Sequence, residues 1–262
     1  MRILILGCGV IGLRVGQRLV ADGHAVTGVR RTPVEATISL TAAFTVLAAD
    51  AGELSLHAGL GFFDAVLLAA NPGIRRGKNN GLARIARIVA AHHRNARAVY
   101  TGTTSLYGDA QGGAVDEDSA IDDTDEARAL RAIETDFLMH PDALVLRATA
   151  LVGPTRTFTR ERIAASGGDV TVKGDLDRPF SYLHEEDLAD LCVTALLGGL
   201  GQGVLNAAAP ETLTVRSYYE LLARHAGIAV RLTSDGSHQP RRRIDAGRLH
   251  ADMPDMIWRR PS

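Results

Sequence analysis

Three glycines near the start of the chain are spaced so that their backbone could receive a phosphate group. Gly7, Gly9 and Gly12 directly follow an apolar, strand-like run and precede an amphipathic stretch that reads as a helix. A strand, a glycine turn and a helix in this order are typical of a dinucleotide-binding site. Gly7 allows the tight turn, Gly9 lets a pyrophosphate approach the backbone, and Gly12 lets the helix pack against the strand. The spacing therefore predicts a bound dinucleotide.

The residues that begin this helix are expected to contact the same ligand. Val10 and Ile11 stand where the first backbone N–H groups of a helix have no partner within the helix. Such groups, together with the helix dipole, favour a phosphate. The alternative interpretation is a glycine-rich turn that holds no ligand. The flanking strand and helix favour the dinucleotide.

Two arginines follow the second predicted strand, residues 25–29. In this type of fold, the residue that ends the second strand meets the adenosine ribose. An acidic residue there binds the 2′-hydroxyl of NAD, whereas arginine suits the 2′-phosphate of NADP. The position holds Arg30 and Arg31 and no acidic residue. We therefore predict NADP, with NAD less favoured; an exposed basic turn is the alternative.

The later strands end in small or polar residues that could line the same site. Strands are predicted at 44–50, 64–70 and 98–102. Small residues at the end of a strand leave room for a cofactor that lies across it. The residues expected to contact the cofactor here are Asp50, Ala69, Ala70, Asn71 and Thr101.

The order of the predicted elements indicates the fold class. Helices at 78–94 and 125–140 alternate with the strands, and a sixth strand is expected at 143–147. This alternation predicts an α/β fold with a Rossmann-type, doubly wound parallel sheet. The pattern changes after residue 147, near Gly153-Pro154. Further elements are expected at 185–197 (helix), 204–206 (strand) and 215–226 (helix).

Composition limits the kind of protein. The chain has 262 residues and a net charge of −1, which argues against general nucleic-acid binding. No apolar run has the length of a membrane span, and the N-terminus lacks the features of a signal peptide, so we expect a cytoplasmic protein. Cys8 and Cys192 offer neither a disulfide framework nor metal-ligand spacing, and we predict no metal. The acidic stretch 109–126 is interpreted as a solvated loop.

Four stretches resemble the extended short-chain dehydrogenase/reductase family, which includes nucleotide-sugar epimerases and dehydratases. Thr103-Thr104-Ser105-Leu106-Tyr107-Gly108 resembles the family's Ser-Ser-x-x-Val-Tyr-Gly segment, and residues 146–154 resemble its Leu-Arg-x-x-x-x-Tyr-Gly-Pro segment. Residues 180–189 are similar to Phe-x-His-x-Asp-Asp-x-Ala. Residues 206–222 resemble the family's late strand and helix. The resemblance covers nearly the whole chain.

This resemblance implies an organisation and a site. Residues 1–150, with 180–206 returning to them, would form the NAD(P)-binding domain. Residues 151–179 and 207–262 would form a small substrate-binding lobe. The family's catalytic hydroxyl falls on Thr103, which would hydrogen-bond a substrate carbonyl or hydroxyl. A homodimer through the helices at 78–94 and 125–140 is also implied.

The chain departs from the family at its Tyr-x-x-x-Lys motif. Aligning Glu134 with the family's following glutamate places Glu126 and Leu130 at the catalytic positions. The glycine spacing also differs from the usual Gly-x-x-Gly-x-x-Gly, and both departures resemble atypical members of the family. Among other proton donors, Tyr107 has the right side chain, although a packed aromatic is the favoured interpretation. A structural hydrogen bond explains His184 about as well as a catalytic role does, and Glu126 is a weaker candidate.

Basic side chains in the second half favour an anionic substrate, because arginine recognises phosphate through several donors. They are Arg156, Arg160, Arg162, Lys173, Arg178, Arg241, Arg242 and Arg243. An arginine-rich composition is the alternative. The resulting hypothesis is an NADP-dependent oxidoreductase or epimerase acting on a small carbonyl or hydroxyl compound, with anionic compounds and sugar nucleotides as the candidate substrates. The alternatives are an NADP-binding sensor without turnover and a non-redox lyase or isomerase.

Overall fold

The computed structural model describes residues 1–32, 42–70 and 81–261. Contacts divide the chain into two compact units. Unit 1 comprises residues 1–106, 124–147 and 188–205, and unit 2 comprises 107–123, 148–187 and 206–262. The chain therefore passes between the units several times. Residues 107–123, predicted within the first domain, group with unit 2.

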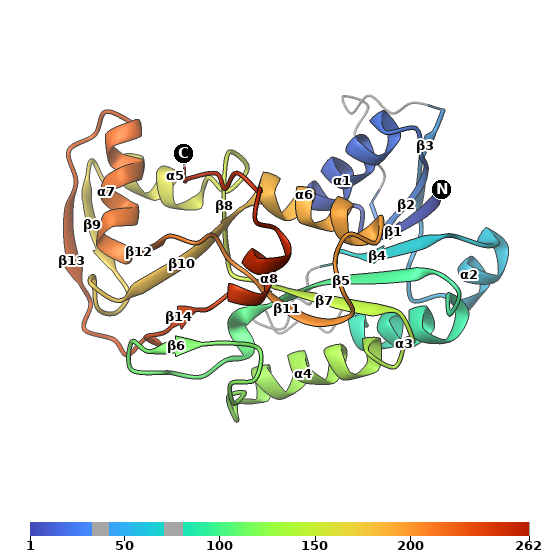
Figure 1. The fold of residues 1–262 in the computed structure, drawn as a ribbon. Helices are drawn as coiled ribbons and strands as arrows, with labels where there is room; N and C mark the ends of the chain where they lie inside the picture. Colours follow the sequence, from blue (N-terminus) through green and yellow to red (C-terminus); the bar gives the residue numbers. More distant parts are fainter. Residues whose placement is uncertain (33–41, 71–80, 262) are drawn as a thin grey trace. The chain divides into compact units, whose positions relative to one another are not determined.

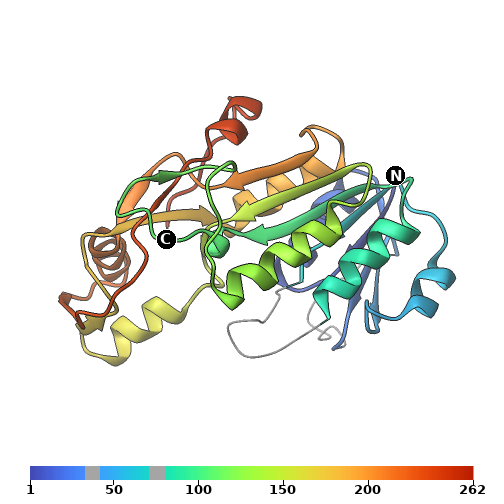
Figure 2. The same ribbon diagram turned by 90° about the horizontal axis from the view of Figure 1, so that it is seen from below.

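Unit 1 is built on a seven-stranded parallel sheet, as the alternation of strands and helices predicts (Figures 1 and 2). The first strand lies inside the sheet, between β4 and β2, and the strand order runs outward in opposite directions from it, which is the doubly wound arrangement. In sheet order the strands are β11 (Gly203–Ala207), β7 (Ala143–Ala148), β5 (Arg97–Thr103), β4 (Ala65–Leu68), β1 (Arg2–Leu6), β2 (Ala25–Arg30) and β3 (Phe44–Ala48).

Helices cover both faces of this sheet. Helices α1 (Val10–Ala21) and α6 (Glu185–Leu196) lie on one face, and α3 (Leu82–His92) and α4 (Asp125–Phe137) lie on the other (Figure 1). The apolar residues of α3 recur at helical spacing and are buried against the sheet. Helix α4 begins where the Thr124 hydroxyl accepts a hydrogen bond from the N–H of Ala127 at 3.2 Å.

The predicted elements of unit 1 are present with small differences in their bounds. The fourth strand is shorter than predicted, and α4 ends at Phe137 rather than at residue 140. The predicted start of α3 at Lys78 lies outside the described residues. The short helix α2 (Leu54–Leu60) was not predicted, because seven residues with three leucines and no side-chain cap carry little periodic signal.

Unit 2 consists of short strands and three helices. A three-stranded sheet contains β12 (Thr212–Thr214), β10 (Pro179–His184) and β8 (Ala150–Val152), and two pairs join β13 (Arg231–Ser234) with β9 (Asp169–Val172) and β14 (Arg243–Ile244) with β6 (Ala114–Val115). The helices are α5 (Phe158–Ala165), α7 (Val215–His225) and α8 (Gly247–Asp252). Most of these strands were not predicted, because two to four residues show no clear alternation and their partners lie far away in sequence.

The acidic stretch is more ordered than the predicted solvated loop. It contains β6, and the side chain of Glu117 is only 3% exposed. Its carboxylate accepts a hydrogen bond from the backbone N–H of Asn206 at 2.7 Å. The carboxylates of Asp109 and Asp116 accept backbone N–H groups in the same way, at 2.8–3.2 Å. The burial of Glu117 and these backbone contacts correct the interpretation of a solvated loop. Several of the acidic residues instead hold the loop in its conformation. No helix within the described residues is long and apolar enough to cross a membrane.

Candidate functional site

The glycine turn after β1 has the conformation that its sequence requires. Gly7 has φ +87°, which L-residues with side chains rarely adopt. The N–H groups of Gly7 and Cys8 donate to the carbonyl oxygen of Val29, at 3.0 and 2.9 Å. A Cβ atom on Gly7 would lie 2.6 Å from the backbone nitrogen of Ala70. Gly7 is therefore needed for both the turn and the close approach of the chain after β4.

Gly9 and Gly12 differ in what surrounds them. A Cβ atom on Gly12 would lie 2.9 Å from the Ile5 side chain, so this glycine allows α1 to pack on β1. A Cβ atom on Gly9 would meet no heavy atom of the described residues within 4 Å. Gly9 is also the N-cap of α1, where no side chain caps the helix and no acidic residue occupies the first turn. Val10 is 44% exposed and Ile11 is buried.

This helix start is suited to an anion. The N–H groups of residues at the N-terminus of a helix lack intrahelical acceptors, and the helix dipole adds a positive potential. The space beside Gly9 is open, so a pyrophosphate could approach these groups. The described residues around this turn thus fit a dinucleotide.

Cys8 is a packing residue in this turn. Its side chain is fully buried, and a Cβ atom on Gly28 would lie 2.7 Å from its sulfur. Burial raises the pKa of the Cys8 thiol to about 12, and the positive charge of Arg30 opposes this only in part. Cys8 therefore stays a neutral thiol, and its packing explains why β2 carries a glycine at position 28.

The predicted ribose-binding arginines lie at the end of β2. Arg30 is partly buried and its charge acts on Cys8, which places it beside the glycine turn. Arg31 is exposed. Asp50 follows β3, the neighbouring strand, is exposed, and accepts a hydrogen bond from the N–H of Gly52 at 2.8 Å. These residues share the carboxyl edge of the sheet with the glycine turn, because the strands are parallel.

The other predicted cofactor contacts follow β4 or lie in β5. The N–H of Ala69 donates to the carbonyl oxygen of Leu6 at 2.8 Å, and Ala70 packs on Gly7. The Thr101 hydroxyl donates to the carbonyl oxygen of Leu68 at 3.4 Å. Asn71 lies outside the described residues. The small residues Ala69 and Ala70 therefore lie beside the glycine turn.

Thr103 ends β5 and belongs to a pair of hydroxyl groups. Its Oγ1 donates to the Ser105 hydroxyl at 3.0 Å and accepts the N–H of Ser105 at 3.1 Å. Both side chains are partly exposed. The strand end and the following 3₁₀ turn, Thr104–Leu106, thus hold the Thr103 hydroxyl in one orientation. Ser105 was not singled out from the sequence, although its position two residues after Thr103 could have indicated a contact between the two hydroxyl groups.

The two positions of the family's missing motif lie on α4. Glu126 is partly exposed in the first turn of the helix. Leu130 is buried, with 3% of its surface exposed, and takes part in packing. A leucine cannot supply the ammonium that lowers a neighbouring tyrosine's pKa. Chemistry in this unit therefore cannot use a Tyr–Lys pair at these positions.

A buried ion pair supports this part of unit 1 and was not recognised as such from the sequence. The Arg147 guanidinium donates to both carboxylate oxygens of Glu134, with Nη2 to Oε2 at 2.8 Å and Nε to Oε1 at 3.0 Å. The two side chains are 1% and 2% exposed. A Cβ atom on Gly102 would lie 3.3 Å from Glu134 Oε1. The pair thus joins α4 and β7 behind the end of β5.

Tyr107 and His184 belong to unit 2, where each has a structural contact. Tyr107 is 1% exposed, and its hydroxyl donates to Asn206 Oδ1 at 2.8 Å. His184 is buried, and its Nδ1 accepts the N–H of Glu186 at 3.2 Å at the start of α6. These contacts agree with the packed-aromatic interpretation of Tyr107. We therefore assign neither residue a proton-transfer role.

Comparison with known proteins identifies the class. The model of the NAD dependent epimerase/dehydratase family matches residues 3–208, and the chain belongs to this family. The chain is 28% identical over 245 residues to Protein YeeZ of Escherichia coli K12, covering 87% of this chain and 84% of YeeZ.

Two solved structures share the fold. The Bordetella bronchiseptica enzyme WbmH, solved with NAD⁺, has a TM-score of 0.82 and 18% identity, over 99% of this chain and 93% of WbmH. UDP-glucuronic acid 4-epimerase from Bacillus cereus, solved with NAD, has a TM-score of 0.77 and 18% identity, over 95% of this chain and 91% of that enzyme. The predicted extended short-chain dehydrogenase/reductase resemblance is confirmed.

Proposed function

We propose that this protein is an NAD(P)-dependent oxidoreductase or epimerase that acts on a hydroxyl or carbonyl group of a sugar nucleotide. The observation that carries the proposal is the glycine turn, in which Gly9 opens onto free space at an uncapped helix start. Family membership supports the use of a nicotinamide dinucleotide. The similar enzyme from Bacillus cereus is named for a UDP-sugar substrate.

Each part of the proposed site has its own task. The N–H groups at Val10 and Ile11 would hold the pyrophosphate, and Arg30, Arg31 and Asp50 would contact the adenosine end. The bound dinucleotide supplies hydride chemistry. The Thr103 hydroxyl would orient the reacting oxygen of the substrate. Because Leu130 replaces the lysine, the proton would be exchanged through this hydroxyl and its neighbour Ser105 rather than through a tyrosine.

We propose NADP as the preferred cofactor, although the similar structures contain NAD. Arg30 and Arg31 end β2 with no acidic residue at this position, and a guanidinium pairs with a 2′-phosphate. Replacing both by alanine is expected to weaken NADPH binding about tenfold or more and to leave NADH binding nearly unchanged, as measured by calorimetry. Tighter binding of NADH by the unchanged protein would overturn the NADP preference and leave the oxidoreductase proposal intact.

An anionic substrate is supported by Arg178 of unit 2. Its Nε is buried and has no hydrogen-bond partner within the described residues. Burial lowers the pKa of this guanidinium, and the nearby groups Tyr219 and Asp175 only partly offset that effect. A buried donor without an acceptor costs about 1–3 kcal/mol. A phosphate oxygen would supply the acceptor.

Arg178→Gln is therefore expected to weaken binding of UDP about tenfold or more, without lowering the thermal midpoint of unfolding. Calorimetry with UDP measures the first effect, and thermal unfolding measures the second. Arg231→Gln is the matched control, because Arg231 is an exposed arginine of the same unit that pairs with Asp169 at 2.9 Å. Equal UDP affinity in the Arg178 variant and the control would contradict the anion site.

The resemblance also implies a homodimer, and we propose that a second copy pairs through α3 and α4. These two helices pack side by side on one face of the sheet (Figure 2). Their outer surfaces carry the exposed charged side chains Arg87 and Arg128. Static light scattering of the purified protein distinguishes the dimer from a monomer.

A further inference from the structure

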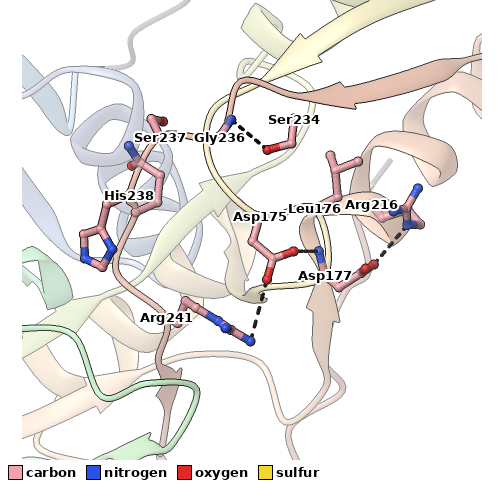
Figure 3. Close-up of a pocket in the computed structure, with 10 residues that line it drawn as sticks. Asp175, Leu176, Asp177, Arg216, Ser234, Gly236, Ser237, His238 and Arg241 are labelled. Carbon is pink, nitrogen blue, oxygen red and sulfur yellow. Dashed lines mark hydrogen bonds and ion pairs between the residues drawn. The ribbon is translucent and has the colours of Figure 1, made fainter.

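A pocket of about 550 Å³ lies within unit 2, and its lining contains none of the residues assigned above to the cofactor (Figure 3). It is formed by the loop between β9 and β10, by the end of β13 with the loop that follows it, and by the first turn of α7. Its lining is Asp175, Leu176, Asp177, Arg216, Ser234, Gly236, Ser237, His238, Gln239 and Arg241. The volume lies within the usual range for small-molecule sites, about 300–1,000 Å³.

The two loops of this pocket are tied together. Asp235 accepts the N–H of Gly174 at 2.9 Å, and the Ser234 hydroxyl donates to the carbonyl oxygen of Gly174 at 2.7 Å. Gly174 has φ +73°, and a Cβ atom there would lie 2.6 Å from the Gln239 side chain. The hydrogen bonds from Gly174 and Ser237 lower the pKa of the Asp235 carboxyl to about 2. These contacts hold the two loops together without a ligand, which reduces the entropy lost on binding.

The charged groups of the pocket are already paired with one another. Arg216 Nε lies 3.0 Å from Asp177 Oδ1, and Arg241 Nη2 lies 3.6 Å from Asp175 Oδ2, as Figure 3 shows. His238 faces Asp109 at 3.4 Å. Two arginines and two aspartates thus line the pocket with no net charge. An anion would meet both carboxylates, and a cation would meet both guanidinium groups.

A neutral ligand with several hydroxyl groups would be repelled neither by the carboxylates nor by the guanidinium groups. Each hydroxyl both donates and accepts hydrogen bonds. A carboxylate beside a guanidinium presents an acceptor and a donor side by side, which matches two adjacent hydroxyls. Ser237 and Gln239 add uncharged groups of both kinds, and Leu176 is the one apolar side chain of the lining.

We propose that this pocket binds a neutral sugar. The lining contains no residue of the cofactor site, so failure of the sugar test leaves the cofactor proposal intact; Arg178 lies outside the lining but near its residue Asp175. The proposal assigns unit 2 a carbohydrate site in which paired charges, rather than a single charge, provide recognition.

The test is a titration of the full chain with glucose, galactose and N-acetylglucosamine, followed by ¹⁵N chemical-shift changes, and with inorganic phosphate as the charged comparison. Saturable binding of one of these sugars, with shift changes at Gly236 and Ser237, is expected, whereas phosphate at the same concentration should leave these signals unchanged. Absence of saturation with all three sugars, or stronger binding of phosphate, would overturn the proposal.

Two variants locate the effect in the pocket. Asp177→Asn removes the charged partner of Arg216, and Arg241→Gln removes the charged partner of Asp175. Each substitution is expected to weaken sugar binding at least tenfold.

Arg231→Gln again serves as the control, since its exposed pair with Asp169 lies on the neighbouring strands β13 and β9. Thermal unfolding shows which variants are folded, and Gln239→Ala replaces any variant that is not. Equal weakening in the control would place the binding elsewhere and overturn the proposal.

Discussion

Replacing Gly9 by valine is expected to abolish binding of the nicotinamide dinucleotide while leaving the protein folded. The backbone of Gly9 has φ −88° and ψ −152°, so it is extended and does not require the positive φ that favours glycine. A Cβ atom at this position meets nothing within 4 Å in the described structure. The new side chain would instead fill the space through which the pyrophosphate approaches.

The expected loss of NADPH affinity is about 100-fold or more, equivalent to about 2.7 kcal/mol. The unfolding free energy should fall by no more than about 1 kcal/mol, because only the N-cap preference changes. Calorimetry and urea unfolding measure the two quantities.

Gly201→Val is the matched control for this substitution. Gly201 belongs to the same unit, and a Cβ atom there also meets nothing within 4 Å. This variant should bind NADPH like the unchanged protein. If Gly9→Val also binds NADPH with unchanged affinity, the glycine turn is not the dinucleotide site and the proposed function loses its main support.

Replacing Arg147 by methionine should cause the largest loss of stability. The Glu134 side chain is only 2% exposed and lies next to Gly102. Its carboxylate would stay buried there without the guanidinium that contacts both of its oxygens. Removing one member of a buried ion pair typically costs about 3–5 kcal/mol, because the remaining charge is buried and unpaired. The nearby charge of Glu134 contributes to the raised pKa of Tyr100, although burial is the main cause. This places the carboxylate close to the core of the sheet.

The double variant Glu134→Gln/Arg147→Met separates the effect of the unpaired charge on stability from the effect of the lost contacts. It should be more stable than Arg147→Met alone, since no charge remains buried. Arg128→Gln is the control, because Arg128 pairs with Asp125 on the exposed side of α4. An exposed pair of this kind contributes at most about 1 kcal/mol. A loss below 1 kcal/mol in Arg147→Met, measured by urea unfolding, would contradict a structural role for the pair.

The class of this protein could be recognised from the sequence because its signals are local. The glycine turn occupies six residues, and the longer helices and most strands of unit 1 have a pattern that is visible within their own length, whereas the short helix α2 does not. Gly7 shows which features of a residue local sequence can predict and which it cannot. The tight turn at Gly7 was expected from the glycine spacing, whereas the close approach of Gly7 to Ala70 depends on the pairing of β1 with β4.

The tertiary structure alone decided which distant side chains meet. Tyr107 and Asn206 are 99 positions apart, and only the fold shows that the tyrosine hydroxyl is engaged by the asparagine. The closeness of the Cys8 side chain to Gly28 likewise could not be read from the sequence. In both cases the partners belong to different elements, so no periodicity within one element relates them.

Unit 2 shows the same limit most clearly. Strand β9 has four residues and pairs with β13, more than 60 residues later. Strands this short carry no reliable alternation, and their stability comes from the partner and from packing. The pocket with its paired charges is built by the loops that follow these two strands, so it exists only once β9 and β13 have paired. Local sequence determined the parallel sheet and its glycine turn, and long-range pairing determined the pocket, because each kind of structure depends on contacts over a different distance along the chain.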